Sequence, residues 1–322
     1  MSMASEKTNS GTSGLTGLFS RAGWLSSMVQ GGQTKVLSIT MEYGLVKLLV
    51  SRGTRVLDHR MLVVNPEFFR EGLVTRTARV SGIIRNALQE IGSDHYRIVG
   101  AVPGFQGTIH VLQLPEARGL NPDELIPREA SRTMGISLQT SHLLWYRLPN
   151  SLGRRRWLVV STARRSVSSF LETVRPLGLP VRALDLRPFA LARVVNQPEA
   201  LVVWVAPDGC EVVVVRDSAP VGYQCLSWEA EAVEGRVLVD RLTTMVERTI
   251  AAYEQSTPDM PLSDDAPLYV CGTAAGVETN LGQQVADFLR RPSGELTPPM
   301  AYPAGFPVQD FAVNLGLALR EA

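Results

Sequence analysis

Two stretches of this sequence share one form: an apolar strand, a short polar turn and a second apolar strand. They are residues 35–50, KVLSITMEYGLVKLLV, and residues 200–215, ALVVWVAPDGCEVVVV. The recurrence of this form indicates an internal structural duplication. Lys47 is the only lysine in its apolar strand. It either meets a phosphate or emerges at the edge of the sheet.

A glycine that follows a strand is a second candidate for ligand contact. Gly272 and Thr273 follow the apolar run PLYVC. Because glycine lacks a side chain, this position either lets the backbone approach a purine closely or forms the tight turn that joins a strand to a helix. The sequence has no motif for a P-loop or for a catalytic serine nucleophile, since GxxxxGK[ST] and GxSxG are absent. The histidines are scattered and predict no metal centre: His59, His95, His110 and His142.

Length and composition bound the class of protein. The chain has 322 residues, which is about right for two domains. A net charge of +1 gives no reason to expect nucleic-acid binding. There are three cysteines without metal-ligand spacing, and a reducing compartment is the simplest interpretation. No run of about 18 apolar residues is present, so we expect no membrane-spanning helix.

The first half of the chain is predicted to form a mixed sheet. Strands are expected at residues 35–40, 44–51 and 55–64, with residues 41–43 as the first turn. Apolar residues at helical spacing predict a helix over 77–91 that Gly92 ends. A strand at 96–102 should then lie parallel to the first strand.

A small α+β subdomain is predicted next. Its expected elements are strands at 108–114, 142–148, 157–161 and 181–186 and helices at 121–134 and 165–177. Pro127 should kink or split the first of these helices. The expected loop 149–156 carries Arg154, Arg155 and Arg156, which with Arg164 and Arg165 either face an acidic lipid or partner or belong to a solvated loop.

The second half repeats the theme of the first. The hairpin is followed by a strand at 219–226, a helix at 234–255, a strand at 267–271 and helices at 281–289 and 308–320. Before the first strand, residues 1–32 are expected to be a disordered tail. Within it, an apolar face over 15–29 predicts an amphipathic helix that lies in a membrane surface or packs on the protein.

Six segments of this sequence, in their order along the chain, resemble those of the PilM-like proteins of type IV pilus assembly, which share the actin-like ATPase fold with FtsA. The segments begin with VLSITMEYGLVKLLV, RIVGAVPGFQGTIHVLQLP and LVVSTARRSVSSFLETVRPLGLPVRALDLRPFALAR. They continue with LTTMVERTIAAYE, PLYVCGTAAG and FAVNLGLALR. The resemblance covers about residues 35–320 in the right order.

The resemblance implies an α/β (α+β) actin-like fold of two domains with duplicated mixed sheets. The expected first domain comprises 33–105, 183–198 and 307–322. The inserted α+β subdomain comprises 106–182, and the second domain 199–306.

The resemblance also implies a site for ATP and Mg²⁺, with one Asp at the end of each first strand. Here those positions are Thr40 and Trp204, while Glu42 and Ala206 take the places of glycines. A glutamate facing a polyanion is repulsive. We therefore expect ATP hydrolysis to be lost. If nucleotide binding is retained, Lys47, Glu247, Arg248, Gly272 and Thr273 are the expected contacts; otherwise Glu247 and Arg248 form a solvated helical pair.

The resulting hypothesis is a cytoplasmic pseudo-ATPase, peripheral to the inner membrane, that acts as an adaptor in a type IV pilus or related secretion machine. The resemblance implies that it binds the cytoplasmic tail of a PilN-like bitopic membrane protein in a groove beside the inserted subdomain. It also implies contacts with other pilus assembly components and self-assembly into a ring or filament. Two alternatives remain open: a functional actin-like ATPase of the same machinery, and an FtsA-like scaffold attached to the membrane.

Overall fold

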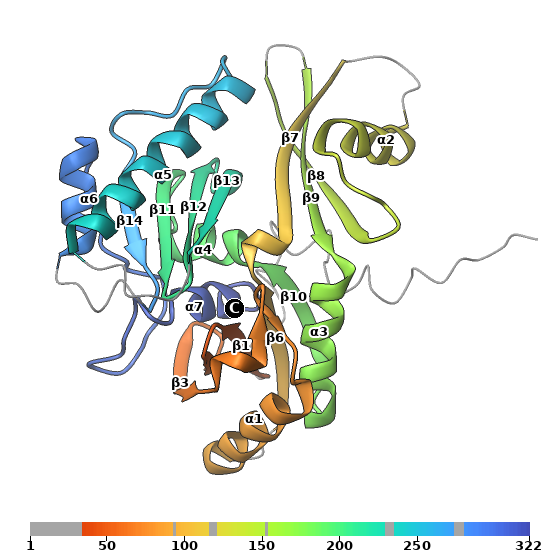
Figure 1. Ribbon diagram of the computed structural model, residues 1–322, viewed down its shortest axis with the longest axis vertical. Coiled ribbons are helices and arrows are strands. Elements are labelled where there is room, and N and C mark those ends of the chain that lie inside the picture. Colours follow the sequence, from red (N-terminus) through yellow and green to blue (C-terminus); the bar gives the residue numbers. More distant parts are fainter. Residues whose placement is uncertain (1–33, 93–94, 116–120, 152–153, 229–234, 274–279) are drawn as a thin grey trace, which may run out of the picture.

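The computed structural model describes residues 34–92, 95–115, 121–151, 154–228, 235–273 and 280–322. The expected tail and the expected amphipathic helix at 15–29 lie outside these ranges. Figure 1 shows three sheets: one in the lower half of the molecule, one at the upper left and a smaller one at the upper right.

The first sheet has five strands in the order β10-β6-β1-β2-β3. Strands β1 (Lys35–Glu42), β2 (Leu45–Arg52) and β3 (Arg55–Val63) form an antiparallel meander, and β6 (Tyr96–Val102) and β10 (Val181–Leu186) add to it in parallel. Helix α1 (Thr77–Ile91) ends at Gly92, as its apolar spacing predicted. Before it in the chain come the short strands β4 (Phe69–Arg70) and β5 (Leu73–Val74), which form a pair of their own, and β5 contacts α3 (Arg164–Val174).

The second sheet has the order β13-β12-β11-β14 and repeats the plan of the first. Strands β11 (Glu199–Ala206), β12 (Gly209–Arg216) and β13 (Ala219–Ser227) form the meander, and β14 (Leu268–Cys271) runs parallel to β11. Helices α5 (Gly235–Ser256) and α6 (Leu281–Leu289) lie together on one side of this sheet. The predicted duplication is confirmed at the level of strand order.

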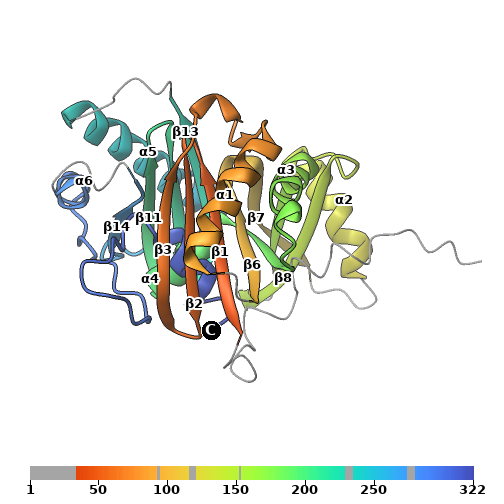
Figure 2. The ribbon, with the colours of Figure 1, turned by 90° about the horizontal axis from the view of Figure 1, so that it is seen from below.

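The third sheet is an insert built from β7 (Gly107–Pro115), β9 (Arg154–Ala163) and β8 (Ser141–Ser151), with helix α2 (Pro122–Met134) against it. The helix at 165–177 and the strand at 181–186 were expected to be elements of this subdomain, and for the strand that grouping is wrong. Strand β10 pairs with β6 in the first sheet, and helix α3 (Arg164–Val174) packs against α1 and β6. Figure 2 shows α3 between the first sheet and the insert. The exact domain boundaries stay a prediction.

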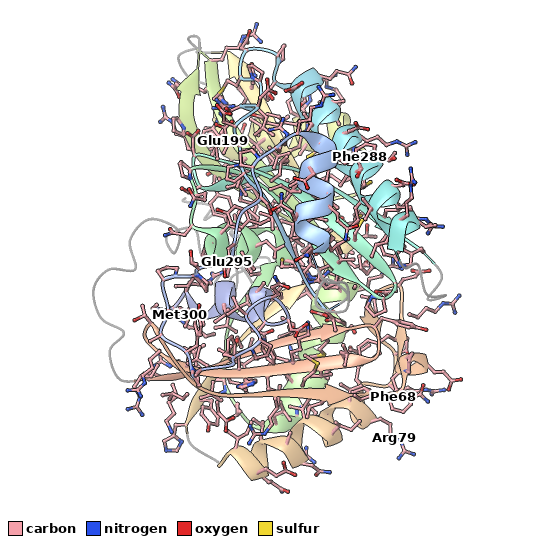
Figure 3. All side chains as sticks on the ribbon, turned by 90° about the vertical axis from the view of Figure 1, so that its left-hand side faces the viewer. Phe68, Arg79, Glu199, Phe288, Glu295 and Met300 are labelled. Carbon is pink, nitrogen blue, oxygen red and sulfur yellow. The ribbon has the colours of Figure 1, made fainter. Side chains whose placement is uncertain are left out.

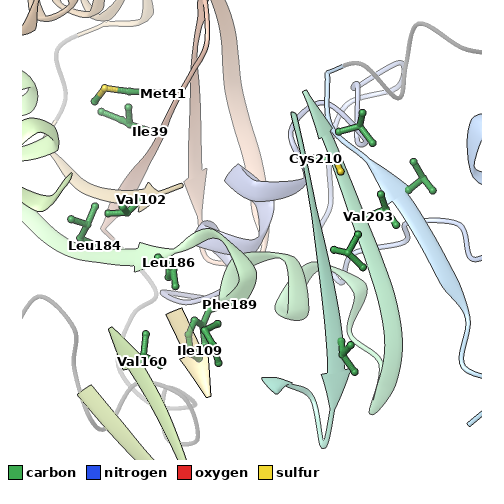
Figure 4. Close-up of a cluster of buried hydrophobic side chains, with 14 of the residues drawn as sticks. Ile39, Met41, Val102, Ile109, Val160, Leu184, Leu186, Phe189, Val203 and Cys210 are labelled. Atoms are coloured by element: carbon green, nitrogen blue, oxygen red, sulfur yellow. The ribbon is translucent and has the colours of Figure 1, made fainter. Parts of the chain in front are cut away.

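Two helices lie between the first and second sheets. These are α4 (Arg187–Val195) and α7 (Ala312–Ala318), which pack on each other and are buried along almost their whole length. The largest apolar core runs without a break through the three sheets described above. Figure 4 shows part of it, from Ile39 and Met41 through Leu186 and Phe189 to Ile109 and Val203. By contrast, Phe288 on α6 is 60% exposed and points away from the molecule in Figure 3.

Several local expectations need correction. The predicted loop at 149–156 is instead strand on both sides of residues 152–153, and Arg156 within β9 is only 2% exposed. The polar triplet suggested a loop, but an alternating strand turns every second side chain inward. Helix α2 is not split at Pro127, and α7 is shorter than the predicted 308–320. The two hairpin turns are Tyr43–Gly44 and residues 207–208, so Glu42 and Ala206 end their strands rather than lie in the turns.

Candidate functional site

The first hairpin places Lys47 and Glu42 in a buried ion pair. Thr40, at the position of the expected Asp, lies directly across the β1–β2 ladder from Lys47. The Lys47 ammonium lies 2.9 Å from a Glu42 carboxylate oxygen and donates to the Asp310 carbonyl oxygen at 2.7 Å. Both charged side chains are at most 1% exposed. Lys47 therefore neither emerges at a sheet edge nor points into open space for a phosphate.

Thr40 is occupied by a contact with α7. Its hydroxyl donates to the Asn314 side-chain oxygen at 3.1 Å. The Asn314 amide nitrogen donates in turn to the carbonyl oxygens of Ser38 and Lys47, at 3.0 and 3.2 Å. Asn314 is fully buried. Helix α7 thus packs on the part of β1 where an ATPase of this fold class would bind a metal-coordinated water.

The second hairpin repeats this arrangement with the charges exchanged. Trp204, at the position of the other expected Asp, lies across the β11–β12 ladder from Glu211. The Arg187 guanidinium, from the start of α4, stacks 3.6 Å from the centre of the Trp204 ring and forms a 2.7 Å ion pair with Glu211. Such stacking is a favourable cation–π contact. Glu211 also accepts a hydrogen bond from the Gly104 amide at 2.8 Å.

The two hairpins face the same space. Thr273, which follows β14, donates to the Glu42 carboxylate at 3.2 Å and so links the first hairpin to the second sheet. The charges of Arg187 and Glu42 both act on Asp208 in the second turn. Burial raises the pKa of Glu211, while Arg187 and the Gly104 amide act against that rise. Burial likewise raises the pKa of the Asp208 carboxyl.

Gly272 allows the backbone after β14 to pack closely against β11. Its φ is +105°, a conformation that residues with side chains rarely adopt, and a Cβ there would collide with the Val205 carbonyl oxygen. The tight-turn interpretation therefore accounts for this glycine. Thr273 is held by Glu42 in the way just described. Glu247 and Arg248 are exposed on α5, and Arg248 lines a surface cavity together with Leu226 and Asp240. Nucleotide contact and a solvated pair both stay predictions for these two residues.

The residues at this position do not fit ATP with Mg²⁺. A triphosphate needs unpaired cations, backbone amides and a metal between its oxygens and the protein. Here Lys47 and Arg187 are each paired with a carboxylate, and Glu42 and Glu211 would repel the phosphates. Among the residues that the structure describes, no group of three or more His, Cys, Asp or Glu side chains could hold a metal ion. Thr40 and Trp204 bring no carboxylate to this position for a metal, and the two cations beside them, Lys47 and Arg187, are already paired.

Three residues of this site were not singled out from the sequence: Arg187, Glu211 and Asn314. For Glu211 a signal existed, because it is the one charged residue inside the apolar run CEVVVV, as Lys47 is inside LVKLLV. An isolated charge in a strand with both faces buried must find a partner. Cys210 and Cys271 are free and buried, and burial raises the pKa of each thiol to about 12.

The fold is that of the actin-like ATPases, with strand meanders, crossover helices and two hairpins that face each other. The first solved structure to compare is a PilM–PilN type IV pilus biogenesis complex. It matches 89% of this chain and 98% of its own with a TM-score of 0.72 at 19% identity. The ethanolamine utilization protein EutJ of Carboxydothermus hydrogenoformans matches 89% of this chain and 90% of its own, with a TM-score of 0.55 at 14% identity. The cytoplasmic domain of EpsL, from the type II secretion system of Vibrio cholerae, matches 89% and 94%, with a TM-score of 0.51 at 12% identity.

Within that class, the chain has a PilM-like fold. No protein-family model and no curated protein matches the sequence. Across the part of the chain that the structure describes, no helix combines the length and the apolar character needed to cross a membrane.

Proposed function

We propose that this chain is a nucleotide-independent adaptor of a type IV pilus or related secretion machine. The observation that carries the proposal is the pair of buried ion pairs, Lys47–Glu42 and Arg187–Glu211, at the position where the fold class binds phosphates. A fold that keeps both hairpins but pairs the charges between them can still serve as a scaffold that binds partner proteins. Hydrolysis is then absent, and function lies in partners.

The proposed partner is the cytoplasmic tail of a PilN-like bitopic membrane protein. Two neighbours in structure support a setting of this kind, a PilM–PilN complex and the cytoplasmic domain of an inner-membrane secretion component. The adaptor would work in the cytoplasm, at the inner membrane. Contacts with other assembly components and formation of a ring or filament are further parts of the same proposal.

The tail would dock on the surface where the insert joins the first sheet, over a small cavity of about 20 Å³ whose surroundings we name the root groove. Its walls combine apolar side chains with two hydroxyl groups; six of the lining residues are Leu73, Val74, Pro103, Ser166, Ser169 and Phe170. Peptides that dock in such grooves use apolar anchors. Leu73 is half-buried and so is available to a ligand without opening the core.

Fluorescence anisotropy tests this part of the proposal. The probe is a labelled peptide that carries the cytoplasmic tail sequence of a PilN-like bitopic membrane protein. We expect the wild-type chain to bind it and Leu73→Glu to bind at least tenfold more weakly, because a carboxylate would have to be buried against an apolar anchor. Leu138→Glu is the matched control, since Leu138 is 41% exposed and lies outside the groove. Equal binding by wild type and Leu73→Glu would contradict the root groove.

A further inference from the structure

The segment between β6 and β7 connects the second sheet to the root groove. Residues Gly104–Gln106 form one turn of 3₁₀ helix directly after Pro103, which lines the groove. On one side this turn is held from the second sheet. Glu211 accepts from the Gly104 amide, and the Tyr223 hydroxyl lies against the carbonyl oxygens of Gly104 and Gly107 and donates to one of them.

On the other side, the same turn holds both walls of the root groove. The Gln106 side-chain nitrogen, Nε2, donates to the Glu71 carbonyl oxygen at 2.6 Å, next to Gly72 and Leu73. The Gln106 side-chain oxygen accepts from the Ser166 hydroxyl at 3.1 Å. The Phe105 ring lies against Gly72 so closely that any side chain at residue 72 would collide with it.

We infer that Glu211 and Tyr223 are positioning residues for the root groove, which they set through the turn at Gly104–Gln106. Gln106 joins the walls to the turn, and Glu211 and Tyr223 join the turn to β12 and β13. In an ATPase of this fold class a nucleotide bridges the two halves at this level. Here a carboxylate and a phenol of the chain itself make that connection. The inference rests on the proposed function of the groove, but its test does not need the tail.

Hydrogen–deuterium exchange on the full-length protein tests the connection. Tyr223→Phe removes only the hydroxyl that contacts the turn. Tyr253→Phe is the matched control, because Tyr253 is equally a tyrosine of the second half, is 3% exposed, and its hydroxyl is buried without a hydrogen-bond partner among the residues described. We expect Tyr223→Phe to speed amide exchange about threefold to tenfold in peptides covering 71–75, 101–108 and 166–171, the range for one lost hydrogen bond.

Glu211→Met, which removes the acceptor for the Gly104 amide, should speed exchange in the same three segments, and Tyr253→Phe should leave them at the wild-type rate. Faster exchange spread evenly over the chain, or confined to 101–108, would overturn the inference, since either means that the turn does not hold the walls. Loss of tail binding plays no part in this readout. A tail that fails to bind while the three segments respond together would refute the docking proposal and leave the connection standing.

Discussion

Replacing Lys47 by methionine tests most sharply whether the first hairpin is closed by its own charges. The ammonium is fully buried, pairs with Glu42 at 2.9 Å and donates to the Asp310 carbonyl at 2.7 Å. Methionine keeps the volume but leaves the Glu42 carboxylate buried without a cation. Breaking a buried pair in this way costs about 3–5 kcal/mol. We therefore expect Lys47→Met to lower the free energy of unfolding by about that amount.

The assay is urea unfolding followed by circular dichroism, on Lys47→Met, Glu42→Gln and the double variant. Because the two side chains interact directly, the double variant should be more stable than the sum of the single losses predicts, by about 1 kcal/mol or more. Arg132→Met is the control: Arg132 pairs with Glu129 on the exposed face of α2 and should cost at most about 1 kcal/mol. Strictly additive losses, or a Lys47→Met loss no greater than that of Arg132→Met, would refute the buried pair.

Further predictions concern single groups. The Glu211 carboxyl should titrate above the ordinary glutamate pKa of 4.5 in a ¹³C NMR titration. Because a raised carboxyl pKa favours the protonated folded form, wild type should lose stability relative to Glu211→Gln as pH rises through the titration midpoint; a midpoint at or below 4.5 would contradict this. Gly272→Ala should destabilise by more than about 1 kcal/mol in urea unfolding, through strain and the collision with Val205. Gly82→Ala, in open space within α1, should instead stabilise by about 0.5–1 kcal/mol, and a similar effect of both changes would rule out the packing role of Gly272.

Much of the fold could be predicted because apolar spacing is a local property. Helix α1 and strands β6 and β10 have the bounds that periodicity and glycine placement indicated. The failures arose where tertiary contacts decide. Strand β10 joins the first sheet through pairing with β6, more than 70 residues earlier in the chain, which no local pattern reveals. Arg156 is buried inside a strand although three consecutive arginines suggested a loop.

The site was predictable in position and not in chemistry. The two hairpins, Thr40 and Trp204 were located from the sequence, and they face the same space as expected. Their partners are remote: Lys47 finds the carbonyl of residue 310, and Glu42 finds Thr273. An isolated charge in an apolar strand indicates that a partner exists but does not identify it. For this reason Lys47 was a candidate for phosphate contact, whereas the structure pairs it with Glu42.

Isothermal titration of the full-length protein with ATP and Mg²⁺ tests the central claim most directly. If Lys47–Glu42 and Arg187–Glu211 fill the phosphate position, the titration should show no binding at micromolar nucleotide, and no phosphate should be released on longer incubation. Binding at micromolar strength together with measurable turnover would contradict the account and restore the ATPase alternative.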